Sequence, residues 1–555
     1  MHLTRRAMRV APRSLATAPA WRCYASSPEP RKSARPAAAA APASPAAPAP
    51  PAPKAPLAPK ASKVPKAPKK PAPAPAKDKD KKEAPLYNFN TSLTYDAVAD
   101  PEVGNYRRVT ASELANFREP PTKVRMLVRD FIDDSLYNPH YGYFSKNVSI
   151  FTPPDEKGYD FGSFRDQNEF QERVAERYES EYGAENGLGR QVWHTPTELF
   201  KPHYARALTA AMVSAYKLNH YPHDFVIYEV GAGNGTFMVD ALTFLKEEYP
   251  DIFARTKYRI VEISGALAKI QRARAEAAGF TNVEVINEDV FKWEGGSSEP
   301  CYVVACEVFD NFSHDMIRYD MGTLEPMQAS VAIDARGDFS VFYEPLHDPL
   351  LRRVLAYRRL LPPSASTQPP LSKPLLASST LRKVYAQIPF APNLSPPEFV
   401  PTKAVAFLER LRDQLPNHRL LVADFDTLPD AVAGRNGPVV QTRYGGTMVP
   451  CETFLVKQGY FDIFFPTDFE LLRDTYSLIM NSPSRRATDG NGKGRGKISN
   501  DFFTGVRGFR RRAINVYSQG EFVMKYGGRE AIKATTTRDG TSLVLSMYHN
   551  TKVLF

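Results

Sequence analysis

The stretch FVIYEVGAGNGTFMVDAL, from Phe225 to Leu242, decides the fold that this 555-residue chain is expected to adopt. Its mostly apolar start, Phe225–Val230, predicts a buried strand. Gly231, Gly233 and Gly235 follow, and the residues after them carry apolar side chains at helical spacing. Glycine permits backbone angles that a Cβ forbids, and it lets a ligand lie directly against the backbone. The stretch therefore predicts a strand, a tight turn and a helix whose first amides can bind polar ligand atoms.

Acidic residues stand where successive strands of such a fold would end. Glu229 is the only carboxylate of the first strand, and Glu262 lies near the end of the next apolar segment, YRIVEIS. Ligands of open α/β sheets gather at the carboxyl ends of the strands, so Glu262 is placed to accept hydrogen bonds from ribose hydroxyls. Asp289 stands at a third strand end. It either contacts an adenine amine or is a solvated loop charge.

The glycines and the acidic residues together resemble the S-adenosylmethionine (SAM) site of Rossmann-like methyltransferases, whose first motif has the pattern E-x-G-x-G-x-G. A dinucleotide-binding turn usually has the pattern G-x-G-x-x-G, with its third glycine one residue later. A turn that uses glycine only for packing is a further alternative. The two strand-end carboxylates favour SAM. The residues that the resemblance assigns to the cofactor are Glu229, Gly231, Gly233, Asn234, Gly235, Glu262 and Asp289.

Helical and strand patterns alternate after this stretch, as a doubly wound sheet requires. We therefore expect an α/β fold: a Rossmann-like, mostly parallel doubly wound sheet with a helical N-terminal extension and insertions. Proline disfavours helix in the residue before it, so an amphipathic helix over residues 124–138 should end before Pro139. The other expected elements are a helix capped by Thr195 or Thr197, helices at 236–248 and 265–278, strands at 259–263, 283–287, 301–310 and 418–429, an antiparallel patch at 328–343, and a helical, proline-rich segment at 349–401 that covers the site.

The start of the chain has a composition unlike the rest. Residues 1–24 contain arginine, small and hydroxyl residues and no acidic side chain, which is typical of a mitochondrial presequence, although a basic disordered tail would look similar. Residues 25–85 are rich in alanine, proline and lysine, which predicts a disordered tether. The remaining residues, 86–555, are expected to form a methyltransferase-like domain. Its expected parts are a nucleotide-binding core at about 222–320, an insertion at about 345–402 and a C-terminal part at 403–555.

The net charge of +11 is weak evidence for a nucleic-acid-binding fold, because lysines of the tether account for much of it. Two basic segments, residues 482–497 and 507–512, are candidates for contact with RNA, the ribosome or an acidic partner, or are plain solvated surface. The four cysteines lack metal-binding spacing, so no metal site is expected. No run of eighteen apolar residues occurs, so no membrane span is expected. The pattern does not indicate an oligomeric state.

Three segments resemble the MidA-like family of mitochondrial and bacterial methyltransferases, which includes a complex I assembly factor that is a protein arginine methyltransferase. They are FIDDSLYNPHYGYF (131–144), HTPTELF (194–200) and IYEVGAGNGTFMVDAL (227–242). ACEVFDNF (305–312) and FDIFFPTDFELL (461–472) are weaker matches. The chain departs from the family pattern at Cys306, where the family has asparagine, and at Ser313 and His314, where it has proline. The chain therefore resembles a divergent member.

The resemblance implies a SAM-dependent protein methyltransferase of the mitochondrial matrix that acts on arginine, with a complex I subunit as a candidate substrate. An arginine nucleophile is charged at neutral pH, so such a site needs carboxylates to hold its guanidinium group. Glu307 and Asp310 stand at the carboxyl end of the strand expected at 301–310 and are the expected catalytic residues, although either could instead support the loop. The alternative is a non-catalytic interaction protein on the same fold, either an assembly factor or a component of the mitochondrial ribosome.

Overall fold

The computed structural model describes residues 101–555 apart from 147, 183–190, 390, 430, 445–446 and 482–513. The predicted presequence and tether, and the basic segments at 482–497 and 507–512, lie outside the described residues.

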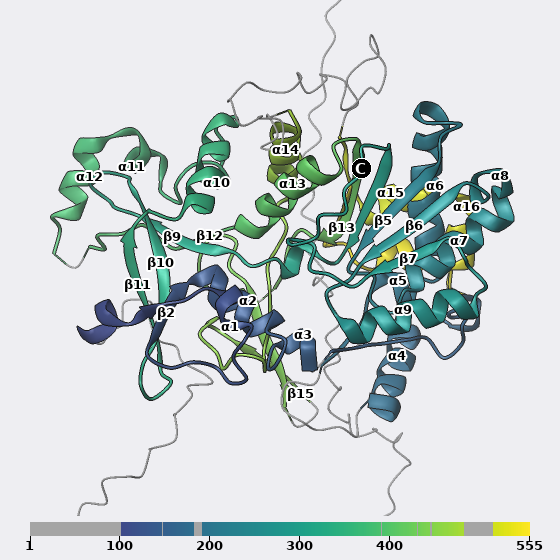
Figure 1. The fold of residues 1–555 in the computed structure, drawn as a ribbon, viewed down its shortest axis with the longest axis horizontal. Helices are drawn as coiled ribbons and strands as arrows, with labels where there is room; N and C mark the ends of the chain where they lie inside the picture. The colour runs from purple at the N-terminus through teal and green to yellow at the C-terminus, as the bar shows by residue number, and fades with distance from the viewer. Residues whose placement is uncertain are drawn as a thin grey trace, which may run out of the picture. The chain divides into compact units, whose positions relative to one another are not determined.

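The largest sheet of the described residues has seven strands in the order β17-β18-β13-β8-β5-β6-β7, and its labelled strands lie in the right-hand part of Figure 1. The five strands from β13 to β7 in this order are parallel, and β18 pairs antiparallel with β13 and β17. The predicted α/β fold with a mostly parallel, doubly wound sheet is therefore confirmed. The strands are β5 (Phe225–Val230), β6 (Thr256–Val261), β7 (Val283–Ile286), β8 (Cys301–Cys306), β13 (His418–Phe425), β17 (Val516–Ser518) and β18 (Thr551–Leu554).

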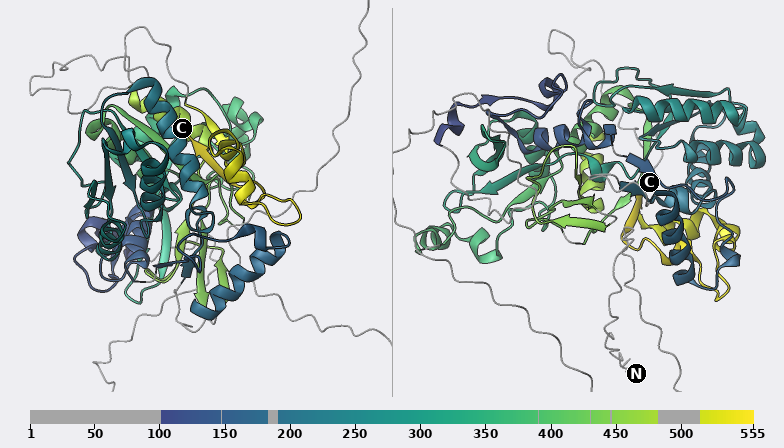
Figure 2. Two further views of the ribbon diagram at one scale, coloured as in Figure 1. Left: turned by 90° about the vertical axis from the view of Figure 1, so that its right-hand side faces the viewer. Right: turned by 90° about the horizontal axis from the view of Figure 1, so that it is seen from below.

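Helices cover both faces of this sheet. Side chains of a strand alternate between faces, so Phe225 and Ile227 pack in one hydrophobic core while Val226 and Tyr228 pack in the other. The first core includes residues of α6 (His203–Asn219), α7 (Thr236–Glu248) and α15 (Gln519–Tyr526), and the second includes residues of α10 (Pro349–Leu360), α13 (Thr402–Gln414) and α14 (Phe469–Met480). Figure 2 shows the C-terminal helices, drawn in yellow, beside α6.

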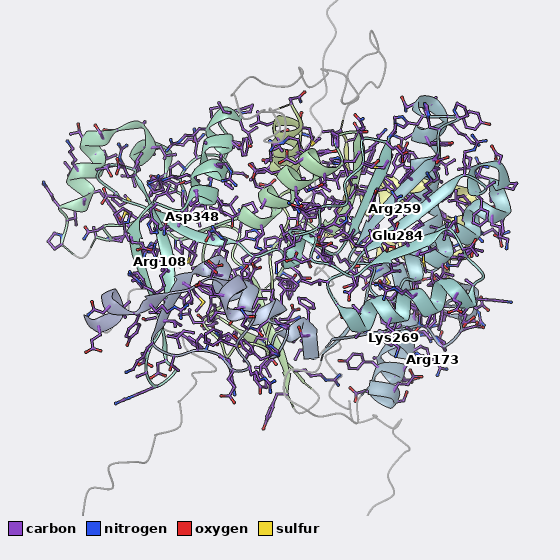
Figure 3. All side chains as sticks on the ribbon, viewed as in Figure 1. Arg108, Arg173, Arg259, Lys269, Glu284 and Asp348 are labelled. Atoms are coloured by element: carbon purple, nitrogen blue, oxygen red, sulfur yellow. The ribbon has the colours of Figure 1, made fainter. Side chains whose placement is uncertain are left out.

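The strand order reverses between β5 and β8. From β5 the chain continues to β6 and β7 on one side, and it then returns to β8 and β13 on the other. In open α/β sheets such a switch leaves a crevice outside the carboxyl ends of the strands, where ligands bind. The edge strand β7 is held in register partly by Glu284, which lies opposite Arg259 of β6 and pairs with it at 3.1 Å (Figure 3).

A second sheet has the order β1-β2-β10-β9-β12, with β11 paired along β10. The expected antiparallel patch is confirmed as the β10–β11 hairpin. The helix expected at 124–138 is wrong in its first part, because Val124–Leu127 pair with β10 and only the following residues are helical. The bounds are β1 (Arg107–Arg108), β2 (Val124–Leu127), α2 (Val128–Tyr137), β9 (Asp315–Tyr319), β10 (Pro326–Ile333), β11 (Phe339–Pro345) and β12 (Glu398–Val400).

Several other boundaries differ from expectation. Residues 301–310 are not one strand, because β8 ends at Cys306 and Phe309–Asn311 form a short 3₁₀ helix. The strand expected at 259–263 ends before Glu262. Thr195 does accept a capping hydrogen bond, and it begins a short helix that is separate from α6. The remaining elements used below are α1 (Ala111–Leu114), α5 (Pro196–Leu199), α9 (Gly265–Ala277), α11 (Lys373–Ala377), α12 (Ser379–Ala386) and β16 (Asp462–Phe464).

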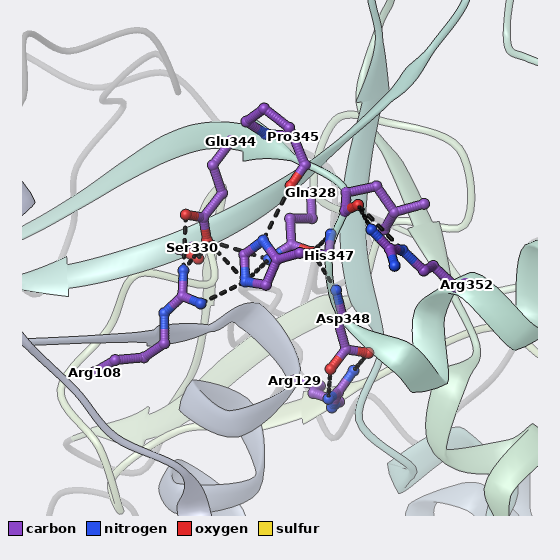
Figure 4. Close-up of polar contacts among 10 residues, drawn as sticks. Arg108, Arg129, Gln328, Ser330, Glu344, Pro345, His347, Asp348 and Arg352 are labelled. Atoms are coloured by element: carbon purple, nitrogen blue, oxygen red, sulfur yellow. Dashed lines mark hydrogen bonds and ion pairs between the residues drawn. The ribbon is translucent and has the colours of Figure 1, made fainter.

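Arg129 fixes α2 against the second sheet. Its guanidinium group donates to both carboxylate oxygens of Asp348, at 2.8 and 2.6 Å (Figure 4). It also donates to Asp315 at 2.6 Å. Asp348 caps α10, and Asp315 is the first residue of β9. One partly buried cation thus joins α2 to two other elements, and this contact holds the C-terminal half of the helix in place.

Candidate active site

A cavity of about 470 Å³ lies at the carboxyl ends of the parallel strands. One wall consists of residues at or just after the ends of β5, β6, β7 and β8. The N-terminal part of the described chain forms the opposite wall, to which α1 and α2 contribute. The structure brings together seven of the nine residues predicted from the sequence: Glu229, Gly231, Gly233, Asn234, Glu262, Asp289 and Glu307. Gly235 and Asp310 are absent from the described residues that line it.

The glycine turn has the backbone geometry that its sequence predicts. Gly231, Gly233 and Gly235 have φ angles of +67°, +53° and +79°, in the left-handed region that disfavours side chains. A Cβ on Gly233 would lie 2.9 Å from Cδ1 of Ile150, which lines the cavity. Gly235 lies just before α7, and its amide donates to the carbonyl of Ala232 at 2.8 Å. Gly235 therefore shapes the turn, while the other two glycines leave the cavity open.

Glu198 supports this turn from outside the sheet. Its Oε1 accepts hydrogen bonds from Thr236 Oγ1 at 2.7 Å and from Asn234 Nδ2 at 3.2 Å. Arg274 of α9 in turn donates to Thr236 Oγ1 at 2.7 Å. Glu198 lines the cavity, but sequence analysis did not select it as a site residue. Its signal was its place in HTPTELF, one of the three family-like segments.

Glu229 is buried at the end of β5. The pKa of its carboxyl is raised to about 8. Burial is the main cause and the nearby Glu262 also raises the pKa, while a 2.7 Å hydrogen bond from the Tyr258 hydroxyl only partly offsets these effects. At neutral pH Glu229 is therefore mostly protonated. It can donate a hydrogen bond to a ligand, which an ionised carboxylate could not do.

Glu262 is held with both carboxylate oxygens in hydrogen bonds. The backbone amide of Ser264 donates to Oε1 at 2.9 Å, and Gln271 Nε2 donates to Oε2 at 2.9 Å. The same Gln271 amide donates to the carbonyl of Gly233 at 2.8 Å. One side chain thus joins Glu262 to the glycine turn. Asp289 also lines the cavity, and its Oδ1 accepts from the amide of Phe291 at 2.9 Å.

The two expected catalytic residues are placed differently. Glu307 lines the cavity with a φ angle of +54°, an uncommon conformation for a residue with a side chain, and its amide donates to Ala423 of β13 at 2.8 Å. Asp310 is fully buried, and its amide donates to Asp424 at 3.1 Å while its carbonyl accepts from Phe465 at 2.7 Å. The chain turns inward after β8, so only Glu307 reaches the cavity.

The far wall contains residues that sequence analysis did not assign to the site. Asp133, Asp134 and Tyr137 come from α2, and Lys403 comes from the start of α13. The signal for the three α2 residues was the segment FIDDSLYNPHYGYF, in which two adjacent acidic residues lie in an amphipathic helix. Lys403 had no such signal. The expectation that segment 349–401 covers the site is wrong for this cavity, because none of its described residues lines it. Its helices α10, α11 and α12 precede β12 of the second sheet.

The cavity is strongly acidic. The carboxyl side chains among its described lining residues are those of Asp133, Asp134, Glu198, Glu229, Glu262, Glu288, Asp289 and Glu307. Against these eight stand only two basic side chains in the described lining, those of Lys292 and Lys403. Even with some carboxyls protonated, this balance favours a cationic ligand over an anionic one.

A family model described as "Putative S-adenosyl-L-methionine-dependent methyltransferase" matches residues 207–484, which are 278 of the 555 residues and include the glycine turn. The chain belongs to this family. The MidA-like resemblance predicted from the sequence is thereby confirmed, with SAM as the family's cofactor. Over the part of the chain that the structure describes, no helix has the length and apolar character needed to span a bilayer. Nor do the described residues contain a group of three or more His, Cys, Asp or Glu side chains suited to a metal ion.

The individual proteins that resemble this chain share little sequence identity with it. The "Protein arginine methyltransferase NDUFAF7 homolog, mitochondrial" of Schizosaccharomyces pombe is 24% identical over 247 residues, which cover 43% of this chain. The match spans about half, 51%, of that relative's length. A Burkholderia thailandensis protein solved with S-adenosyl-homocysteine is 15% identical, with a TM-score of 0.43, and the match covers 80% of this chain and 89% of that one. Another structure of a protein from the same organism, in its native form, gives a TM-score of 0.42 at the same identity and coverage.

The residues of the cavity fit SAM. At Gly231 and Gly233 the turn presents backbone, without a side chain, to the cavity. A Cβ on Gly233 would contact Ile150, and a Cβ on Gly231 would lie 3.1 Å from Val308. Glu262 lies at the end of β6, held in the position expected of a carboxylate that accepts from ribose hydroxyls. The acidic lining suits the positive charge of a sulfonium group.

Proposed function

We propose that this chain is a mitochondrial SAM-dependent protein methyltransferase that methylates arginine and supports the assembly of respiratory complex I. The observation that carries the proposal is one acidic cavity in which the glycine turn, Glu262 and Glu307 meet. Arginine as the target is supported by the acidity of the cavity and by the name of the S. pombe relative. The mitochondrial matrix is supported by the presequence-like composition of residues 1–24 and by that same name.

Bound SAM supplies a methyl group whose carbon bonds to a guanidinium nitrogen as its bond to sulfur breaks, with the bonding electron pair left on sulfur. The chain's part in such a displacement is positioning and electrostatics. In this proposal Gly231, Gly233 and Glu262 bind the cofactor. Glu307 holds the guanidinium group and takes the proton that the nitrogen releases. Its left-handed backbone is consistent with a functional role, because such strain persists where the surrounding structure maintains it.

Calorimetry with SAM on the wild type and on Gly233→Val tests the cofactor site. Tight binding by the wild type and none by the folded variant supports the proposal, whereas no heat from the wild type contradicts it. Incubation of a mitochondrial matrix extract with labelled SAM then tests turnover. Hydrolysis of the labelled proteins should release labelled methylarginine. Loss of this product with Glu307→Gln supports arginine methylation.

A non-catalytic assembly factor is the second candidate. It is favoured by the departures from the family pattern around the catalytic loop, at Cys306 and at Ser313 and His314. It predicts SAM binding without any labelled product. Proteins that co-purify from mitochondria would then identify its partner, and RNA contact through residues 482–497 and 507–512 stays a prediction.

A further inference from the structure

An ion pair on the far wall of the cavity lies outside the residues that the sequence assigned to the cofactor. Lys403 Nζ lies 2.7 Å from Asp133 Oδ2 and 4.2 Å from the centre of the Phe291 ring. The other carboxylate oxygen of Asp133 accepts a 2.6 Å hydrogen bond from Ser313 Oγ. A cation is therefore seated here between a carboxylate and an aromatic face, the arrangement that recognises cationic side chains in general.

The surroundings of Lys403 favour positive charge. Burial alone would lower the pKa of its ammonium group, but Asp133, Asp289 and Asp130 more than offset this effect, and the pKa is raised. The negative electrostatic potential that raises this pKa would stabilise any cation at the same position. Asp133 itself is fixed, because α2 is anchored by the bidentate contact of Arg129 with Asp348.

We propose that Asp133 and the ring of Phe291 form the docking site for the substrate guanidinium group, and that Lys403 occupies this site until the substrate displaces it. The inference rests on the proposed arginine methylation and adds the residues that select the substrate. A guanidinium group offers two parallel N–H donors to a carboxylate and stacks on an aromatic ring, whereas an ammonium group is a point charge. Arginine is therefore the better competitor for the place that Lys403 holds.

The geometry favours a movable lysine. Lys403 is the second residue of α13, at the end of a long side chain with several rotatable bonds, and 21% of its side chain remains exposed. Asp133 keeps its hydrogen bond from Ser313 when the ammonium group leaves. A substrate cation then replaces the ammonium group as the partner of Asp133, so the carboxylate is not left unpaired.

The test is binding of acetyl-Gly-Arg-Gly-amide at millimolar concentration to the full chain saturated with S-adenosylhomocysteine. A matched peptide with citrulline in place of arginine removes the charge and keeps the shape. The wild type should bind the arginine peptide at least about tenfold more tightly, and Asp133→Asn should lose that preference. Lys403→Met should strengthen arginine binding severalfold, because the competing ammonium group is gone.

The matched control is Glu276→Gln, which removes an exposed carboxylate of α9 that is not among the described residues lining the cavity. It should leave the arginine affinity within about twofold. S-adenosylhomocysteine affinity and melting temperature verify that each variant is folded. Equal losses in Asp133→Asn and Glu276→Gln, weaker arginine binding by Lys403→Met, or no arginine preference in the wild type would each overturn the inference. Failure of the wild type to bind S-adenosylhomocysteine would instead refute the proposed function.

Discussion

Thr236, the first residue of α7, donates a 2.7 Å hydrogen bond from its hydroxyl group to Oε1 of Glu198. This contact joins the helix that follows the glycine turn to α5, which lies 38 residues earlier in the chain. Both side chains are buried, and Glu198 also faces the cavity. The shape of the turn therefore depends on a residue outside the nucleotide-binding core.

Substitution of Thr236 should show this dependence. Thr236→Val keeps the shape of the side chain but leaves Glu198 and Arg274 without their shared hydroxyl, and a buried group that loses its partner costs about 1–3 kcal/mol. S-adenosylhomocysteine should bind about tenfold more weakly by calorimetry. Thr236→Ser restores the hydroxyl and should bind almost as the wild type does. Equal affinity for both variants would contradict this role.

Gly233→Ala should abolish cofactor binding for two reasons, the positive φ angle of +53° and the 2.9 Å approach of its Cβ to Ile150. Gly279→Ala is the matched control, since Gly279 has a φ angle of +70° and no atom within 4 Å of its Cβ position. Both variants should lose about 1 kcal/mol of stability from backbone strain, measured by denaturant unfolding. Only Gly233→Ala should also lose binding of S-adenosylhomocysteine.

Glu229 should make the unfolding free energy depend on pH. Its pKa rises from an ordinary value near 4.5 to about 8 on folding, so between these values the folded state binds more protons than the unfolded state. The stability contributed by the protonated carboxyl is complete below about pH 4.5 and is lost as pH rises through about 8. Glu229→Gln cannot titrate, so it should be more stable than the wild type at pH 8 by an amount on the order of 3 kcal/mol.

The measurement is urea unfolding of both proteins from pH 5 to pH 8.5. The difference in unfolding free energy should grow with pH across this window. A constant difference would show that Glu229 is ionised in the folded protein. Tyr258→Phe removes the hydrogen bond that lowers the pKa of Glu229, so it should move the pH dependence to higher pH.

Glu307→Gln should lower methyl transfer by at least about a hundredfold while leaving cofactor affinity within about twofold, because the amide cannot hold the guanidinium charge or take its proton. The measurement is methylarginine released from labelled matrix proteins, with calorimetry on the same samples. Asp310→Asn is the informative comparison, since Asp310 is buried away from the cavity lining. Should Asp310→Asn abolish transfer in a folded protein while Glu307→Gln does not, the assignment of Glu307 is wrong.

Local patterns in the sequence predicted the nucleotide-binding elements well. Phe225–Val230 and Thr236–Glu248 have the predicted bounds, because the apolar runs and the glycine turn between them leave few other conformations. The cavity residues near the ends of β5 and β6 were predicted from the rule that ligands bind at the carboxyl edge of the sheet. These residues were therefore predictable from short stretches alone.

Contacts between distant segments were not predictable in this way. Met126 and Leu127 fit a helical pattern, but Met126 lies opposite Val331 in the second sheet, and that pairing decides the local structure. Asp310 follows Glu307 closely, yet the left-handed backbone at Glu307 turns the chain inward and separates the two side chains. Asp133 and Lys403 are 270 positions apart, as their numbers show, and only the folded chain brings them together.

Gln271 affects how much conformational entropy the cofactor site loses on binding. A single side-chain amide donates to Glu262 and to the carbonyl of Gly233, so contacts within the protein itself join the two recognition elements. A preorganised site loses little conformational entropy when it is filled. The association rate constant of the cofactor should then be close to that of diffusional encounter, without a slow rearrangement of the site. The dissociation rate constant should therefore determine the affinity.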